Sequence, residues 1–150
     1  MGRLMEEHGE FLIPASRNEV WRALQDPLVL KQCIDGCEQM TVINADEFEC
    51  AVTVKIGPVK ARFNGTISIL EAVQPESYTL KVAAEGGAAG FGQGQAHVQL
   101  HETNEGTRLT YAVEGSIGGK LAQIGSRLIQ SFSRKMARSF FESFSKQWVA

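Results

Sequence analysis

The sequence predicts an α+β fold in which a curved antiparallel sheet of about seven strands is covered by one long C-terminal helix. Apolar and polar residues alternate through most of residues 37–117, as they do in strands with one buried face. A first strand and two short helical segments precede this region, and a long helical apolar stripe follows it. Because the apolar face of such a sheet needs a cover, we expect the long helix to lie across it.

Length and composition fit one domain that spans residues 1–150. The chain is 43% hydrophobic with a net charge of −2, which is enough apolar material for a core or a cavity and argues against nucleic-acid binding. No run approaches the roughly 18 apolar residues of a membrane span. The first residues lack the apolar core of a secretory leader, and three cysteines cannot all pair. We therefore expect a cytoplasmic protein.

The N-terminal part is predicted to form a strand and two short helices. A strand over residues 9–14 comes first. Ser16, with Glu19 three residues later, is typical of a capping box and predicts a helix that stops before Pro27. A second short helix is expected over residues 28–34, where an Asp-Gly pair follows.

Six more strands are predicted between residues 37 and 117, separated by turns rich in Asn, Asp, Gly and Pro. The dipeptide Asn64-Gly65 favours a hairpin turn. The alternation nevertheless keeps its phase across Gly65, so one long bent strand is the preferred interpretation.

A long helix is predicted from Lys120 to about Trp148, with one apolar stripe. Residues 119–150 hold six basic residues and one acid, a net charge of +5, which leaves −7 for the rest of the chain. Four basic side chains lie within an arc of about 40° on the polar side: Lys120, Arg127, Arg134 and Arg138. They form either a solvated face or a docking surface for an anionic membrane or a partner, where Phe141 beside them would insert.

Two glycine-bearing segments carry a resemblance. Residues 57–65 (GPVKARFNG) and 118–125 (GGKLAQIG), with the pair Phe140-Phe141, are similar to the carbon monoxide dehydrogenase G-subunit family. The likeness covers nearly the whole chain from about Glu10. It implies the helix-grip fold of the Bet v 1-like, START-related superfamily, whose cavity takes lipids, sterols, polyketides or quinone-like molecules.

The resemblance also implies a partner and a place in the cell. Family members are accessory proteins linked to placing a molybdenum hydroxylase, of the carbon monoxide dehydrogenase type, at the membrane. Some members carry a C-terminal extension that acts as an anchor, and this sequence ends without one. We therefore expect transient, peripheral attachment at the inner face of the membrane.

The residues that alternate toward the covered face are expected to line a cavity for an apolar ligand. Inward strand positions and the helix stripe supply Val52, Val54, Phe63, Ile67, Leu80, Val98, Leu109, Tyr111, Leu128, Phe132 and Met136. The glycine-rich residues 86–94 precede a strand and not a helix, so they do not form a phosphate loop. Phe91 within them belongs either to a plain connection or to a gate at the cavity mouth.

No catalytic residue, metal ligand or cofactor motif is expected. Cys33 and Cys37 could supply two ligands to a metal ion, but no nearby histidine or second cysteine pair completes the site. His97 and His101 lie about 13 Å apart along one strand, which is too far to bind the same ion. The inward positions hold two tyrosines as their only hydroxyl groups and no acid–base pair, unless Glu85 turns inward.

Three functions remain open at this stage. The leading hypothesis is a non-catalytic accessory or carrier protein that holds a lipid or quinone-like molecule. The first alternative is a polyketide cyclase-like enzyme on the same fold, and the second is a pure interaction protein with a filled core. Fold alone does not decide among them.

Overall fold

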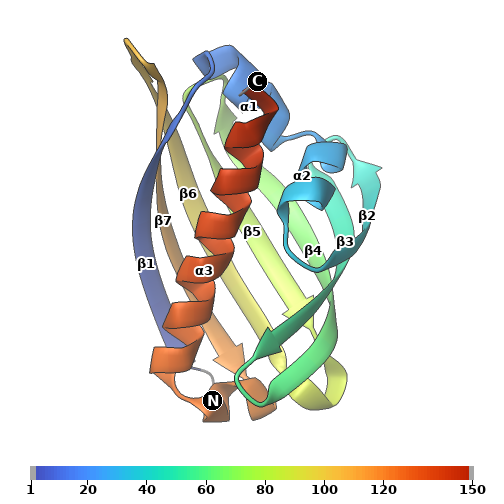
Figure 1. Cartoon of the computed structure of the whole chain (residues 1–150). Coiled ribbons are helices and arrows are strands. Elements are labelled where there is room, and N and C mark those ends of the chain that lie inside the picture. Colours follow the sequence, from blue (N-terminus) through green and yellow to red (C-terminus); the bar gives the residue numbers. More distant parts are fainter. Residues whose placement is uncertain (1–2, 149–150) are drawn as a thin grey trace.

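In the computed structural model, which describes residues 3–148 and the side chains from residue 6 onward, one curved sheet wraps around a long helix (Figure 1). The main elements are β1 (Arg3–Ile13), α1 (Arg17–Leu24), α2 (Pro27–Cys33), β2 (Cys37–Asn44), β3 (Glu47–Ile56), β4 (Val59–Val73), β5 (Ser77–Glu85), β6 (Phe91–Thr103), β7 (Gly106–Gly118) and α3 (Ser126–Ser145). The sheet order is β1-β7-β6-β5-β4-β3-β2, with every neighbouring pair antiparallel. The predicted architecture is confirmed.

The first short helix begins at the cap that the sequence predicts, and the second has a cap that the sequence analysis does not identify. The Ser16 side chain accepts a hydrogen bond from the backbone N–H of Glu19 at 3.3 Å, at the start of α1. Asp26 accepts one from the N–H of Leu28 at 2.9 Å, and Pro27 occupies the first turn of α2. Both helices lie toward the end of the sheet where the C-terminal part of α3 lies (Figure 1), and α2 contacts α3.

Two predicted strand boundaries are wrong, and one prediction about β4 is confirmed. β4 continues through Asn64 and Gly65, so these residues form no hairpin turn. β1 starts at Arg3, six residues before the predicted start. β6 starts at Phe91 within the glycine-rich segment, because Gly94 pairs closely with β7 and a Cβ there would lie 2.7 Å from a backbone oxygen of that strand.

The C-terminal helix is shorter than the sequence predicts. Residues Gly119–Ile124 form a 3₁₀ helix, α3 begins at Ser126, and Lys146–Trp148 form a second 3₁₀ turn. Gly125 separates the first two with a φ of 101°, a conformation that glycine adopts far more easily than other residues. Lys120 therefore does not belong to α3, which corrects the prediction that it shares one helix face with the three arginines.

The buried core is divided into two clusters at opposite ends of α3. One cluster gathers α1 and α2 residues with Phe144 near the C-terminal end of α3. The other gathers Ile56, Phe63 and Leu121 with Ile129 near the N-terminal end of α3. The middle of α3, between Ile129 and Phe144, spans the region between the clusters. None of the described helices is long and apolar enough to cross a membrane.

Candidate functional site

A cavity of about 520 Å³ lies between the two core clusters, enclosed by the concave face of the sheet and by α3. Its wall is almost wholly apolar, with contributions from β1, α1, α2, β3 to β7 and α3. This volume falls within the range of small-molecule binding sites, and such sites are usually apolar with a few polar groups. The interior is therefore hollow, which removes the filled-core alternative.

Small side chains produce the cavity. Four of them form a continuous row across the inner face of the sheet, because their positions are paired strand to strand: Cys50, Gly65, Ala84 and Gly92. Ser133 and Ala137 line the cavity from α3. Native interiors are usually close-packed with side chains. Because the residues of this row and the two helix residues are small, they leave space unfilled between the sheet and α3.

Ten of the eleven predicted lining residues lie on the wall of this cavity: Val52, Val54, Phe63, Ile67, Leu80, Val98, Leu109, Tyr111, Phe132 and Met136. Leu128 does not, and this corrects its prediction: its side chain is 43% exposed. The predicted stripe used every fourth residue and drifted around the helix, so at its start the buried residue is Ile129 and not Leu128.

A smaller hollow of about 300 Å³ adjoins the cavity, and it is called the mouth below. It shares four wall residues with the cavity: Val54, Ile56, Phe132 and Met136. It lies between the end of β3 and the first half of α3, and Leu128, Lys135 and Asp35 border it. Leu128 thus borders the mouth with a partly exposed side chain.

One polar pair interrupts the apolar wall. Glu7 of β1 is 9% exposed, and its Oε2 atom accepts a hydrogen bond of 3.1 Å from the hydroxyl of Tyr111 on β7. Burial, the negative charge of Glu7 and this hydrogen bond raise the pKa of Tyr111 to about 12, so the phenol stays protonated and donates. Glu7 is the only charged side chain among the described residues of the cavity wall.

The Tyr111 ring is held in place from two sides. Gly9 pairs with Tyr111 across β1 and β7, and a Cβ on Gly9 would lie 2.4 Å from the ring. The rings of Phe11 and Phe141 stack on it with centroids 6.2 and 6.0 Å away. Phe141 also stacks on Phe11 at 4.5 Å and lines the cavity, so its inward packing corrects the prediction that it inserts into a membrane.

Sequence reasoning missed Glu7 because it started the first strand too late. Inward positions on β1 alternate as Glu7, Gly9, Phe11 and Ile13, and the last of these is fully buried. Following that alternation back from Ile13 would have placed the carboxylate inside. Glu85, the carboxylate considered at the sequence level, is exposed.

Phe91 does not line the cavity, which corrects the gate prediction. It is 45% exposed and pairs with Gly118 on β7, where its ring covers the glycine. Inward positions of β6 are the even-numbered ones, such as Gly92 and Val98, so Phe91 points to the outer face.

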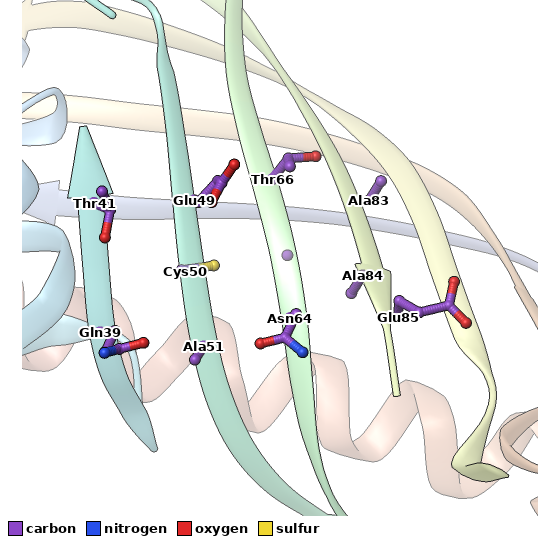
Figure 2. Close-up of a pocket in the computed structure, with 11 residues that line it drawn as sticks. Gln39, Thr41, Glu49, Cys50, Ala51, Asn64, Thr66, Ala83, Ala84 and Glu85 are labelled. Atoms are coloured by element: carbon purple, nitrogen blue, oxygen red, sulfur yellow. The ribbon is translucent and has the colours of Figure 1, made fainter. Parts of the chain in front are cut away.

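The outer face of the sheet carries a separate polar hollow of about 400 Å³, shown in Figure 2. Glu49, Asn64, Thr66 and Glu85 project into it from β3, β4 and β5. These side chains are exposed to solvent, and among the described residues no three His, Cys, Asp or Glu side chains are placed to hold a metal ion. The enclosed apolar cavity is the better candidate site.

The three thiols offer little nucleophilic chemistry. Burial is the main cause that raises the pKa values of Cys33, Cys37 and Cys50, so all three stay protonated near neutral pH. Burial also raises the pKa of Tyr78, whose ring lines the cavity and meets Trp21 edge-on at 5.4 Å.

The family model of the carbon monoxide dehydrogenase G subunit (CoxG) matches residues 9–148. The chain belongs to this family. The resemblance noted in the sequence is thereby confirmed. The matched residues include nine of the ten strand and helix segments in full, from α1 to α3, and the last part of β1. No curated protein matches this CoxG-family chain significantly.

Solved structures confirm the fold of this CoxG-family protein. A conserved protein from Geobacillus kaustophilus is 30% identical with a TM-score of 0.89, over 95% of this chain and 94% of that one. A truncated norcoclaurine synthase from Thalictrum flavum is 12% identical with a TM-score of 0.63, over 99% and 95%. Ara h 8.0201 is 13% identical with a TM-score of 0.65, over 97% of each chain. The fold is the Bet v 1-like helix-grip fold.

Proposed function

We propose that this CoxG-family protein is a non-catalytic carrier that binds a lipid or quinone-like molecule in its cavity. The observation that carries the proposal is the apolar volume of about 520 Å³ under α3, with one polar pair on its wall. Each CH₂ group of a ligand that leaves water there contributes about 0.8 kcal/mol before the costs of binding. A long apolar chain would thus bind with few hydrogen bonds.

A cavity-blocking variant tests this function. Ala96 lies on the inner face of β6 and lines the cavity, so Ala96→Phe should occupy the site while the strand pairing is kept. We expect the wild type to bind the neutral apolar dye Nile red, and Ala96→Phe to weaken binding by about tenfold or more, about 1.4 kcal/mol.

The matched control places the same side chain outside. Ala83 is exposed on the outer face of β5, and Ala83→Phe should bind the dye as the wild type does. Equal binding by Ala96→Phe and Ala83→Phe would contradict the proposal. Native mass spectrometry of the protein purified from its host identifies the molecule that it carries.

A second candidate function is a polyketide cyclase-like enzyme, which the Glu7–Tyr111 pair favours. A carboxylate and a phenol in an apolar site are groups that enzymes use for proton transfer. One of the structural neighbours is a norcoclaurine synthase, which is an enzyme on this fold. Incubation with the molecule extracted from the host separates the two functions: a carrier returns it unchanged, and a cyclase converts it and loses this conversion in Tyr111→Phe.

We further propose that the carrier docks on an anionic membrane through α3, at the side that borders the cavity mouth, and there serves a carbon monoxide dehydrogenase-type molybdenum hydroxylase. Arg127, Arg134 and Arg138 are exposed and lie within about 40° of one another around α3. Leu128 is the exposed apolar residue between this face and the mouth. The family name supports the enzyme partner.

A further inference from the structure

The Glu7–Tyr111 pair gives the cavity a polarity that restricts the ligand. The Tyr111 hydroxyl donates to Oε2 of Glu7, and no other hydrogen bond or ion pair to this carboxylate occurs among the residues with described side chains. No Lys, Arg or His side chain of the described residues lines the cavity. The carboxylate therefore has accepting capacity that the protein leaves unused at the wall of an apolar space.

A buried carboxylate with an unused oxygen discriminates between head groups. An alcohol, a phenol or a protonated amine donates a hydrogen bond to it, and hydrogen bonds to a charged group are stronger than neutral ones. An ether or a ketone has no proton to donate, and a fatty acid brings a second negative charge into the same low-dielectric space. Tyr111 cannot offset that charge, because its proton is already committed to Glu7.

The position of the pair also orients a ligand. Glu7 and Tyr111 stand on β1 and β7, at one edge of the sheet, whereas the mouth opens beside β3 near the other edge. The wall between them is apolar and includes the row of small residues from Cys50 to Gly92. A head group on Glu7 thus places the apolar tail along the cavity toward Leu128 at the mouth.

We infer that the cavity selects apolar molecules whose head group donates a hydrogen bond, such as an alcohol, a phenol or an amine, and that it excludes apolar carboxylates. Glu7 is the residue that accepts the hydrogen bond from the head group. This inference rests on the proposed carrier function and narrows its ligand class: a quinol, which is a phenol, can donate to Glu7, whereas an oxidised quinone, which is a diketone, cannot.

Displacement of Nile red by decanol, decylamine, decanoate and decyl methyl ether tests the inference on the full chain. The alkyl tail has ten carbons in decanol, decylamine and the ether, and nine beyond the carboxyl carbon in decanoate, so the compounds differ mainly in the head group. We expect decanol and decylamine to bind about tenfold more tightly than the ether and decanoate. In Glu7→Gln, decylamine should lose this advantage and decanoate should gain affinity, because the charge is removed while the side chain keeps its size.

Two further variants make the outcome decisive. Glu6→Gln changes an exposed carboxylate on the opposite face of β1 and should leave the order of affinities unchanged. If Glu7→Gln does not fold, Tyr111→Phe serves instead: it frees the second oxygen of Glu7 and should increase the preference for decylamine. Equal affinities of all four compounds in the wild type, or an unchanged order in Glu7→Gln, would overturn the inference. Dye binding that no decyl compound competes for also overturns it, whereas the absence of any dye binding overturns the carrier function itself.

Discussion

At the scale of single residues, a missing side chain at Gly9 determines where the polar end of the cavity lies. The Tyr111 ring lies across Gly9, and only without a Cβ at that position can its hydroxyl reach Glu7 from the neighbouring strand. Neither Gly9 nor Gly92 has a positive φ, so the effect of replacing either residue by alanine depends on the contacts of the added Cβ atom and not on backbone strain.

Gly9→Ala should therefore displace the Tyr111 ring and disturb its hydrogen bond to Glu7. The added Cβ would meet ring atoms at 2.4 Å, and overpacking of this kind costs about 1–3 kcal/mol of unfolding free energy. Urea denaturation measures the change. Gly92→Ala is the matched control: its Cβ would lie 3.7 Å from Ile117, an ordinary contact, so stability should stay the same or rise slightly. Equal stability of Gly9→Ala and Gly92→Ala would show that the ring is not held against Gly9.

At the scale of elements, Gly125 decides where the cover of the sheet begins. The apolar pattern alone predicts one continuous helix from Lys120, whereas the backbone at Gly125 turns the chain between a 3₁₀ helix and α3. As a result Leu121 packs into one core cluster while Arg127 and Leu128 point to solvent.

Gly125→Ala should destabilise the protein through the backbone alone. A Cβ at this position meets nothing within 4 Å, so no clash contributes. The φ of 101° is strained for alanine, at about 1–3 kcal/mol. Thermal unfolding followed by circular dichroism measures the loss, and Ser126→Ala, an exposed change one residue later, should stay within about 0.5 kcal/mol of the wild type. A Gly125→Ala protein as stable as the Ser126→Ala protein would mean that the helix can begin earlier, as the sequence pattern predicts.

At the scale of the whole molecule, positive charge is concentrated in residues 119–150, which carry +5 in a protein whose net charge is −2. The exposed arginines stand on α3, whose Leu128 and Lys135 border the mouth, and each basic residue near an anionic bilayer contributes about 1 kcal/mol. The acidic remainder of the chain opposes tight adhesion, so the attraction is expected to be reversible and sensitive to salt over a Debye length of about 8–10 Å.

The double variant Arg127→Glu/Arg134→Glu should bind anionic vesicles about thirtyfold more weakly or worse, since it removes about 2 kcal/mol of attraction and adds repulsion. Vesicle sedimentation at low and high salt measures binding. Lys60→Glu/Lys81→Glu is the matched control, because it changes the net charge equally on the exposed outer face of β4 and β5. Weakening of equal size in both double variants would assign the effect to net charge and contradict docking through α3.

Local patterns in the sequence determined the number and order of the strands, the cap of α1, and the face to which most side chains point. Alternation with a period of two is a local property, so it predicts that Val52, Phe63 and Leu109 face inward, and these residues line the cavity. The same rule, applied to a first strand with the wrong start, missed Glu7.

Only the tertiary structure decided whether the interior is filled, which polar groups meet there, and where the cavity opens. The hollow arises because small residues on β3, β4, β5 and β6 fall into one row and face Ser133 and Ala137 of α3, and no single segment carries that coincidence. Glu7 and Tyr111 meet although 104 positions separate them in the chain. Such contacts depend on the register between strands and on the turn at Gly125. Packing brings together side chains from segments that are distant in the sequence, whereas periodicity describes each segment separately.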